Sequence, residues 1–542
     1  MKLTNLFKRS KDKWKKDHED KVKVTVDSDL IQTDVPKVLN SIKVTLGNSS
    51  DIITRNFKTG KDGSIEIGIA YMDGLADKTF VQDSIIEPLM SDLRIAPLDS
   101  GVLKNTNLFN VIRDFNILGG EMKEISDLKT LYTHLLSGDT IVLIGGYSKG
   151  FAVGSRGFEG RGVQEPSSQT VVRGPKDGFS ETLRTNTSLV RRRIKNTDLW
   201  IETMQVGKKT QTDVAVLFIK GVANDKVVNE VRNRIKKINI DAVLESGYIE
   251  EMIQDETFTP FPTIYNTERP DAACAALLEG RIVIMVDGTP FVLIAPAVFV
   301  QFFQSSEDYY QRADISTSLR FLRFFSFFLA LLTPSVYIAV TTFHQEMIPT
   351  DLLISLAAQR EGVPFPAVVE AIVMEITFEI LREAGVRMPR AVGSAISIVG
   401  ALVLGQSAVE AGIVSASMVI IVSLTAISSF VCPSFNMAIS IRLLRFLFMI
   451  AAATFGLFGI SIGIIIMVAH LASLRSFGVP YLSPMAPFIP ADQKDVLVRA
   501  PIWAMFTRPR FISQSDVDRE DTSSPKPPNQ SGNGSDSGGE NT

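Results

Sequence analysis

The chain has 542 residues, of which 45% are hydrophobic and 21% charged, and its formal net charge is -3. This length predicts several domains. A near-neutral charge gives no global electrostatic case for nucleic-acid binding, so we expect no nucleic-acid partner. Because Cys274 and Cys432 are the only cysteines, a disulfide framework and a CxxC metal site are both excluded.

The first 35 residues are interpreted as a basic, flexible arm. Lys8 to Lys23 is a charge run, and the arm has no apolar stretch long enough for a secretory signal. We therefore expect the soluble region that follows to stay in the cytosol. The arm is either a solvated segment or a contact to anionic lipid head groups.

Residues 36–150 and 151–315 are predicted to form two α/β subdomains that divide near Gly150. Short apolar runs typical of strands occur at 65–70, 140–144 and 214–219. The third run leads into residues 226–238, where Val and Ile recur at helical spacing. Strands that alternate with helices indicate an α/β fold.

Residues 281–303 are apolar enough to resemble a membrane span, but Asp287 and Gly288 interrupt them. An Asp-Gly pair between β-branched runs is a hairpin signal, because glycine adopts positive φ at low cost. We predict a hairpin followed by an interfacial segment, and a transmembrane helix is the alternative.

A basic segment lies within the second predicted subdomain. Between Arg156 and Lys195 it contains nine basic residues and four acidic ones. Ser180 is placed to cap the helix that carries three consecutive arginines. The candidate anion or phosphate site consists of Arg173, Lys176, Arg191, Arg192 and Arg193. The alternative is a solvated helix face that forms salt bridges to acidic segments of a partner.

Residues 316–490 are predicted to be an all-α, multi-pass membrane domain of four to six helices. Phe324 to Phe343 carries no charge, Phe446 to Leu474 has only His470, and Ala391 to Ile441 has only Glu410. A bilayer core about 30 Å thick needs about 20 apolar residues per helix. The longest run is therefore predicted to cross twice, with a turn at residues 410–412.

The helix predicted at residues 367–388 decides the topology, because it is both apolar and charged. At about 100° per residue, several of its charges share one face. Ionisable residues at membrane depth usually belong to a transport path. The candidate ion path comprises Glu370, Glu375, Glu379 and Glu383.

Two other interpretations of this helix remain open. It could lie at the membrane surface as an amphipathic helix. Its charges could also pair within the helix, Glu379 with Arg382 and Glu383 with Arg387.

If this helix crosses the membrane, the spans total five. Most flanking arginines then fall on the cytosolic side, as the positive-inside rule expects. They are Arg320, Arg323, Arg382, Arg387, Arg390, Arg442 and Arg445. The tail conflicts with this count, because five crossings place its arginines outside, and one long helix at 446–474 does not remove the conflict. These are Arg499, Arg508 and Arg510.

Small residues recur in the last apolar run, at Gly456, Gly459 and Gly463. This spacing allows helices to approach closely. The contact is either within the subunit or between copies.

Residues 491–542 are predicted to be a C-terminal tail. From about residue 513 the tail is rich in Ser, Asp, Gly, Pro and Asn. Such a composition buries too little apolar surface to order itself, so we expect disorder there.

The chain contains no phosphate-binding loop, no dinucleotide fingerprint, no HExxH and no GxSxG. Its four histidines lie far apart in sequence. We expect neither an enzyme nor a resident metal or cofactor.

Seven blocks of the sequence stand out in chain order: VQEPSSQTVVRGPKDGFSETLRTNTSLVRRRI (163–194), TERPD (267–271), LLEGRIVIMVDGTPFVLIAP (277–296), EDYYQR (307–312), VPFPAVVE (363–370), LREAGVRMPRAVGSAISIVGALVLGQSAVEAGIVS (381–415) and SFGVPYLSP (476–484). Together and in this order they resemble the A subunits of GerA-type spore germinant receptors. The resemblance extends from about residue 30 to 510.

The resemblance implies a multi-pass protein of the spore inner membrane with its N-terminal domain in the cytosol. The expected partners are a transporter-like B subunit that binds the nutrient, a lipoprotein C subunit, membrane lipid and further copies of this chain. The implied activity is a nutrient-gated cation channel that starts germination by ion release, and not an enzyme.

Two alternative functions remain open. One is a SpoVAF-type paralogous sporulation membrane protein that acts beside the receptor. The other is a stand-alone secondary transporter, although such proteins usually contain repeated halves and we find no repeat among the predicted spans.

Overall fold

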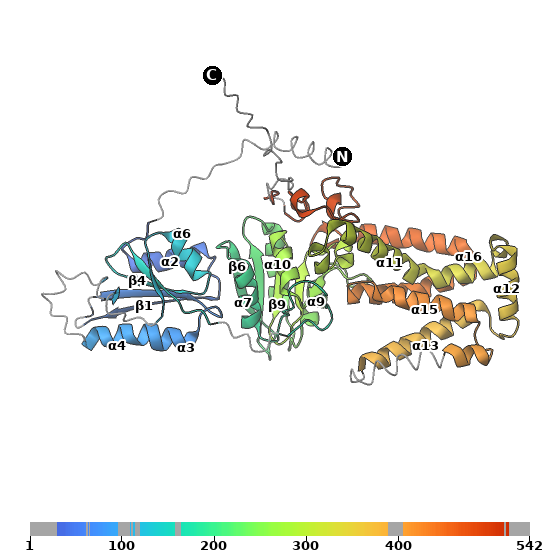
Figure 1. Cartoon of the computed structure of the whole chain (residues 1–542), viewed down its shortest axis with the longest axis horizontal. Coiled ribbons are helices and arrows are strands. Elements are labelled where there is room, and N and C mark those ends of the chain that lie inside the picture. The colour runs from blue at the N-terminus through green and yellow to red at the C-terminus, as the bar shows by residue number, and fades with distance from the viewer. Residues whose placement is uncertain are drawn as a thin grey trace, which may run out of the picture.

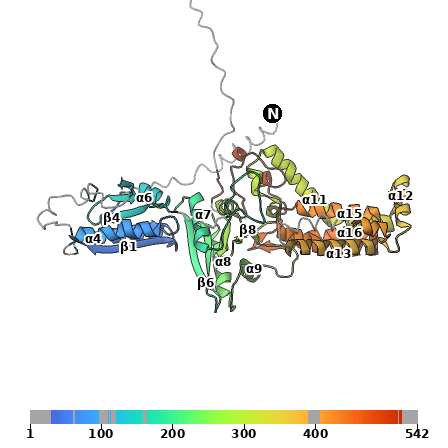
Figure 2. The ribbon, with the colours of Figure 1, turned by 60° about the horizontal axis from the view of Figure 1, so that its bottom comes forward.

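The computed structural model describes residues 30–519, apart from 61–62, 64, 96–108, 110–111, 114–119, 158–163, 388–404 and 514–515. Two α/β subdomains and a helical bundle follow one another along the long axis (Figure 1). The same order is seen after rotation about that axis (Figure 2). Most of the predicted basic arm and the tail beyond Arg519 lie outside the described residues.

The first subdomain is a five-stranded antiparallel sheet in the order β1-β2-β4-β5-β3. Its strands are β1 (Ile52–Thr59), β2 (Ile65–Met72), β3 (Met122–Ile125), β4 (Thr140–Ile144) and β5 (Gly150–Val153). Its helical elements are α2 (Val35–Thr45), α3 (Lys78–Phe80), η1 (Val81–Ile86), α4 (Glu87–Ile95) and α6 (Leu128–Leu135).

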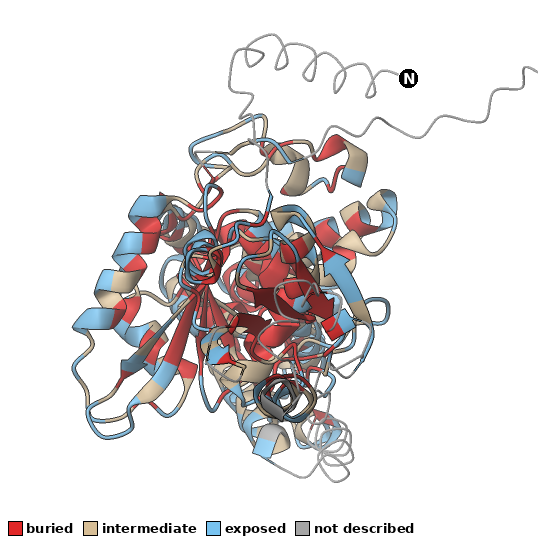
Figure 3. Ribbon diagram, turned by 90° about the vertical axis from the view of Figure 1, so that its left-hand side faces the viewer, coloured by how far each residue is buried: buried red, intermediate tan, exposed pale blue. Residues whose placement is uncertain are grey.

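Side chains alternate between the two faces of this sheet, as in any pleated strand. Ile67 and Ile69 of β2 pack with Val81 and Ile85 of η1. On the opposite face, strand residues pack against α2 and α6. The sheet therefore has a helical layer on each side, and its strands β2, β4 and β5 consist mostly of buried residues, which are red in the end-on view of Figure 3.

The second subdomain repeats this topology. Its strands are β6 (Leu199–Val206), β7 (Thr212–Ile219), β8 (Tyr265–Thr267), β9 (Ile282–Val286) and β10 (Val292–Ala295), in the antiparallel order β6-β7-β9-β10-β8. Its helices are α7 (Leu183–Arg193), α8 (Asp225–Lys237), α9 (Ser246–Ile253) and α10 (Pro270–Leu278). Helices fall between equivalent strands in both subdomains, so the soluble region is a structural duplication.

The predicted strands and the helix at 226–238 are present as β2, β4, β7 and α8. The hairpin is also present, since Leu293 of β10 pairs with Ile284 of β9 and Gly288 has a φ of +90°. The boundary expected at Gly150 falls inside the first sheet, because β5 pairs with β4. The first subdomain therefore extends past residue 153.

A linker with two 3-10 turns, η2 (Phe299–Phe303) and η3 (Ser306–Tyr309), leads into the bundle. The bundle contains α11 (Ala313–Thr342), η4 (Gln345–Met347), α12 (Thr350–Arg360), α13 (Ala367–Arg387), α15 (Ala416–Phe430) and α16 (Phe435–Ser473). Two of these helices, α11 and α16, are long and apolar enough to cross a membrane.

The helix α16 reverses direction at Gly456, where φ is +60° and ψ is -141°. A Cβ placed on Gly463 would lie 2.7 Å from Phe448 Cε1, although a straight helix would separate these residues by about 22 Å. Ser440 and His470 both hydrogen-bond to the segment 259–260. The element is therefore two antiparallel helices, each about 25–32 Å long.

We call the end of the bundle beside the α/β subdomains the near end, and the opposite end the far end. The helix α11 begins at the near end, where Ser316 bonds to the Asp308 carbonyl, and ends against Gly456 at the far end. Ser473 is back at the near end. The path from Ser316 to Ser473 thus begins and ends at the near end and traverses the bundle an even number of times, which does not fit the predicted five crossings.

The remaining helices agree with this direction. Glu370, at the start of α13, bonds to Ser415, which caps α15. Gly412, in the predicted turn, has a φ of +64° and lies against Gly362 at the far end. From there α13 and α15 both run back toward the near end (Figure 1).

The outer surface of the bundle is apolar. Ile420, Leu447, Phe455 and Ile465 are each at least 60% exposed. Water would disfavour so large an exposed apolar surface, whereas lipid would cover it. The apolar surface and the two long apolar helices thus indicate that the bundle associates with a membrane.

The C-terminal segment returns to the second subdomain through β11 (Arg475–Ser476) and β12 (Val479–Pro480). Phe477 packs in the core of that subdomain, and Tyr481 donates to the Pro262 carbonyl. The elements η5 (Gln493–Asp495) and η6 (Ile502–Ala504) follow. Residues 475–490, predicted as part of the membrane domain, thus lie on the soluble side.

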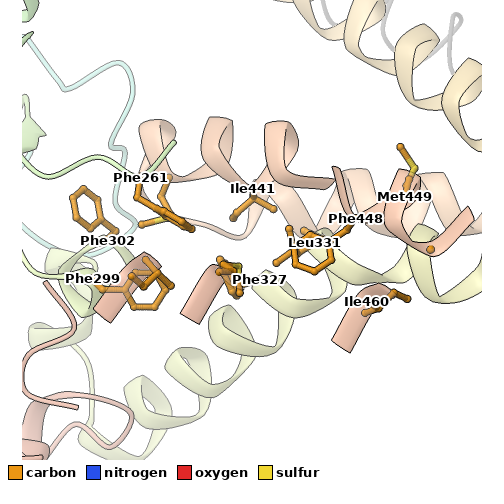
Figure 4. Close-up of a cluster of buried hydrophobic side chains, with 14 of the residues drawn as sticks. Phe261, Phe299, Phe302, Phe327, Leu331, Ile441, Phe448, Met449 and Ile460 are labelled. Carbon is orange, nitrogen blue, oxygen red and sulfur yellow. The ribbon is translucent and has the colours of Figure 1, made fainter. Parts of the chain in front are cut away.

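Order also extends beyond residue 513, where disorder was expected. The Ser513 side chain is buried and donates to the Val222 carbonyl, and Thr507 pairs with Asp518. One apolar core continues from Phe261 and Phe299 of the soluble side to Phe448 and Ile460 of the bundle (Figure 4).

Candidate functional site

Ion pairs connect α13 and α16 inside the apolar bundle. Glu375 Oε2 accepts a hydrogen bond of 2.6 Å from Arg445 Nη1, and both side chains are almost completely buried. One turn nearer the subdomains, Glu379 Oε2 accepts a 2.8 Å bond from Arg442 Nη1. We call these four residues the ion-pair ladder.

The ladder is anchored to two further helices. Arg445 Nε donates to the Ala330 carbonyl of α11 at 2.7 Å. Arg382 donates to Ser429 Oγ of α15 at 2.8 Å and lies over the ring of Phe430. The charged residues thus hold four helical segments together.

Together with Arg382, whose Nη1 atom lies 3.5 Å from Glu379 Oε1 as the predicted pair within the helix, the ladder carries a surplus of positive charge. Glu375 and Glu379 face three guanidinium groups, those of Arg382, Arg442 and Arg445. Several buried polar atoms of this cluster have no hydrogen-bond partner among the described residues. They are Glu375 Oε1, Glu379 Oε1, Arg382 Nε and Arg445 Nη2. Unsatisfied buried polar atoms are costly. The cluster could therefore form further hydrogen bonds.

Glu370 lies at the far end, apart from the ladder. Its Oε2 atom accepts from Ser415 N at 3.0 Å and Ser415 Oγ at 2.9 Å. Arg360 Nε is 3.4 Å from its Oε1 atom. Glu370 therefore joins the start of α13 to the start of α15.

Glu383 forms the i,i+4 pair with Arg387 that the sequence predicts, at 2.5 Å. Both side chains are mostly exposed. They line an open groove beside α13 with Ile376, Glu379, Ile380 and Ala384. The structure thus places Glu375 and Glu379 together, Glu383 at the edge and Glu370 at the far end.

Arg442 and Arg445 do not lie on the cytosolic flank where sequence reasoning put them. Arg445 is about ten residues into the first half of α16, or about 15 Å along the helix. It is buried against Glu375. The carboxylates keep these arginines inside the bundle, because their charges compensate one another.

A second charged cluster joins the bundle to the soluble side. Asp308 Oδ2 accepts from Arg320 Nε at 3.1 Å and from Arg323 Nη1 at 2.7 Å. Arg320 also donates to Asp495 of the C-terminal segment at 2.8 Å. Linker, first span and C-terminal segment therefore meet at Arg320, which we call the junction.

Tyr309 completes the junction by donating to Asp495 Oδ2 at 2.7 Å. Burial, together with the Asp495 carboxylate, raises the pKa of Tyr309 well above its ordinary value. Beside it, burial lowers the pKa of Lys494 to about 8. The C-terminal segment is thus held by a protonated phenol next to a poorly hydrated amine.

The structure separates the residues of the predicted basic site into buried and exposed ones. Arg191 is buried at the boundary between the subdomains, where its Nε atom donates to Asp51 Oδ2 at 2.8 Å. Arg193 bonds to Asp177, and exposed Lys176 lies 3.6 Å from Glu165. Arg173 and Arg192 are exposed. Arg191 therefore belongs to a structural contact and not to a surface patch.

The helix α7 also differs from expectation at its start. Its N-terminal residue Leu183 donates to Asp287 Oδ1 at 2.9 Å, while Thr182 occupies the N-cap without a side-chain bond. The cap is thus supplied by the hairpin turn, and Ser180 instead bonds to Asn186.

Gly456, Gly459 and Gly463 make contacts within the chain itself. Gly456 forms the reversal of α16, and Gly463 faces Phe448 in the opposite half. Gly459 lies against the Ala451 carbonyl. These contacts allow the two halves to pack closely. The described residues contain no cluster of His, Cys, Asp and Glu that fits a metal ion.

Residues 40–511 match the family model described as Bacillus/Clostridium GerA spore germination protein. The chain belongs to this family. The sequence resemblance is thereby confirmed over most of the chain.

Several relatives from Bacillus subtilis (strain 168) match nearly the whole GerA-family chain. Spore germination protein KA is 53% identical over 491 residues, which cover 91% of this chain and 89% of the relative. The uncharacterized membrane protein YfkQ is 44% identical, with 91% and 94% coverage.

A solved structure is also similar. The N-terminal domain of the A subunit of the Bacillus megaterium spore germinant receptor GerK3 is 39% identical. The match covers 51% of this chain and all of that domain, with a TM-score of 0.40.

Proposed function

We propose that this GerA-family protein is the A subunit of a nutrient-responsive spore germination receptor. In this proposal several copies form a channel in the spore inner membrane, with the α/β subdomains in the cytosol. A transporter-like B subunit binds the germinant, a lipoprotein C subunit completes the receptor, and the channel then releases cations. Family membership and the membrane bundle support this assignment.

The ion-pair ladder is the observation that carries the channel proposal. Charged residues at membrane depth are expensive and usually mark an ion path. In the single chain, Glu375 and Glu379 are neutralised by arginines, so the described arrangement corresponds to a closed state. Opening requires these carboxylates to exchange partners.

The groove beside α13 supports assembly of several copies. Glu379 and Glu383 line it, yet one chain leaves it open. Lipid would solvate such carboxylates poorly. A second copy that covers the groove would place the acidic residues between subunits, where they can face water and cations.

A spore experiment tests this function. Glu375→Gln, Glu379→Gln and Glu383→Gln are introduced separately at equal protein level, with exposed Glu361→Gln as the matched control. After exposure to rich nutrient medium, we expect at least one of these three variants to change the rate of potassium release several-fold, while the control does not. Unchanged release in all three would remove the acidic residues from the mechanism.

Deletion strains separate a receptor subunit from an accessory protein. If the chain is the A subunit, deleting it or its B partner abolishes the same nutrient response. A response that is only slowed when this chain is missing, but is lost without B, would indicate a protein that acts beside the receptor.

A further inference from the structure

The carboxylates of α13 outnumber the arginines that face them on α16. Glu375, Glu379 and Glu383 are spaced by four residues, or about 6 Å along the helix, close to one turn. On the antiparallel first half of α16, Arg442 and Arg445 are also separated by nearly one turn. The present pairs are Glu375 with Arg445 and Glu379 with Arg442.

We propose that α13 has two stable positions on α16, one helical turn apart. In the present register, Glu379 pairs with Arg442. In the second register α13 moves about 5.4 Å toward the far end. Glu379 then pairs with Arg445, and Glu383 pairs with Arg442. This register shift rests on the proposed channel function, and it identifies α13 as the helix that moves when the channel opens.

Both registers contain two ion pairs between α13 and α16, but the second leaves Glu375 without its arginine, so the present register is the more stable one until a signal acts. Glu375 Oε1 and Arg445 Nη2 have no hydrogen-bond partner among the described residues, so the present register does not use every hydrogen bond available there. A sliding ladder exchanges partners without leaving either arginine unpaired. Few buried charged groups permit such movement, because breaking a single pair is strongly unfavourable.

The packing of α13 permits the movement. Its buried residues are Ala367, Glu370, Ala371 and Glu375, all in its first nine residues. Among the described residues of α13 after Glu375, none is buried. The open groove runs along this second part. Beyond Glu375, α13 is therefore held by polar side-chain contacts, such as the bonds of Glu379 to Arg442 and of Arg382 to Ser429, and not by buried apolar residues.

Glu370 favours the present register. Its bonds to Ser415 resist a shift of α13 toward the far end. Once shifted, Glu370 leaves Ser415 and moves toward the aqueous surface of the membrane. Glu375 also leaves Arg445, which releases a negative charge inside the bundle, as a cation path requires. An opening signal from a partner must offset both changes.

Two charge swaps distinguish the registers. The double variant Glu379→Arg with Arg442→Glu keeps both present pairs but places like charges together in the second register. The double variant Glu379→Arg with Arg445→Glu places like charges together in the present register and forms both pairs only in the second. Both variants contain the same types and numbers of charges. A merely structural role of the present pairs predicts normal release with the first swap, which keeps them, and loss of folded protein with the second, which breaks them.

The test measures potassium release from spores that contain equal amounts of each variant. We expect the first swap to release potassium at least tenfold more slowly after rich nutrient medium. We expect the second swap to leak at least tenfold faster without nutrient. Normal nutrient-triggered release by the first swap, equal effects of the two swaps, or the opposite order would overturn the sliding register.

A single substitution tests the same proposal if a double variant does not reach the membrane. Glu370→Gln weakens the bonds to Ser415 and should speed nutrient-triggered release about three- to tenfold. Unchanged or slower release would contradict the proposal.

If the proposed channel function itself is wrong, a different result is expected. In that case potassium release remains normal when the whole chain is deleted, and neither swap changes it. If release depends on the chain but both swaps respond normally, the channel stands and only the register shift falls.

Discussion

Arg191 of the second subdomain and Asp51 of the first form an ion pair whose side chains are 1% and 2% exposed. Arg191 also donates to the Leu199 carbonyl at 2.7 Å. Close by, Ser49 Oγ accepts from Ile201 N at 3.0 Å. The duplicated subdomains are therefore joined by buried polar contacts as well as by the chain.

We expect Arg191→Met to destabilise the boundary between the subdomains. Removing one partner of a buried pair leaves an uncompensated charge and typically costs about 3–5 kcal/mol. Thermal unfolding of the purified chain in detergent measures the loss, with exposed Lys195→Met as the control. The double variant Arg191→Met with Asp51→Leu should recover part of the stability, and no recovery would contradict this account of the pair.

Asp308→Asn should weaken the junction between the soluble side and the first span. Asp308 is shared by Arg320 and Arg323 and is buried, so losing its charge should cost about 3–5 kcal/mol. The control is Asp314→Asn, whose exposed pair with Arg312 should be worth about 0–1 kcal/mol.

Limited proteolysis of the C-terminal segment reports the Asp308→Asn effect. We expect faster cleavage after residue 490, because Arg320 holds Asp495 in the same cluster. Cleavage at the rate of the Asp314→Asn control would show that the junction does not hold this segment.

Gly463→Ala should destabilise the reversal of α16. Its new Cβ would lie 2.7 Å from Phe448 Cε1, and overpacking of this kind typically costs about 1–3 kcal/mol. Gly362→Ala is the control, since no described atom lies within 4 Å of its Cβ position. Both variants are compared by melting temperature in detergent, and equal values would argue against the folded-back helix.

Glu250→Gln should make stability less dependent on pH. Burial, reinforced by the charge of Glu245, raises the pKa of Glu250 from an ordinary 4.5 to about 7. The folded chain therefore binds more protons than the unfolded chain between these values, and stability is lost as pH rises through that window.

The gain from Glu250→Gln should consequently appear at pH 8 and vanish near pH 4.5. We expect a melting temperature about 2–4 °C higher at pH 8. Glu251→Gln, at the exposed neighbouring position, should change little at either pH. A similar gain at both pH values would exclude ionisation of Glu250 as the cause.

The predictable parts of the fold depend on local patterns. The strand at 214–219 and the hairpin at Asp287 and Gly288 follow from alternation and turn chemistry within a few residues. The reversal at Gly456 escaped prediction because the apolar composition of residues 446–474 is the same for one long helix and for two short ones. Whether the chain traverses the bundle an odd or an even number of times thus depends on the reversal at Gly456.

The site was only partly predictable for a related reason. Helical spacing correctly brought Glu375 and Glu379 to one face, but their partners lie 70 and 63 residues away. Arg191 in a run of three arginines looked exposed, although Asp51 is 140 residues distant. Charge pairs between remote elements leave no periodic signal in the sequence.

Conductance of the purified chain tests the central claim most directly. The chain is incorporated into planar lipid bilayers together with its B and C partners, and rich nutrient medium is added. We predict cation-selective current steps that require this chain and change size or open time with Glu379→Gln. Current no greater than that of the partners alone would contradict the account.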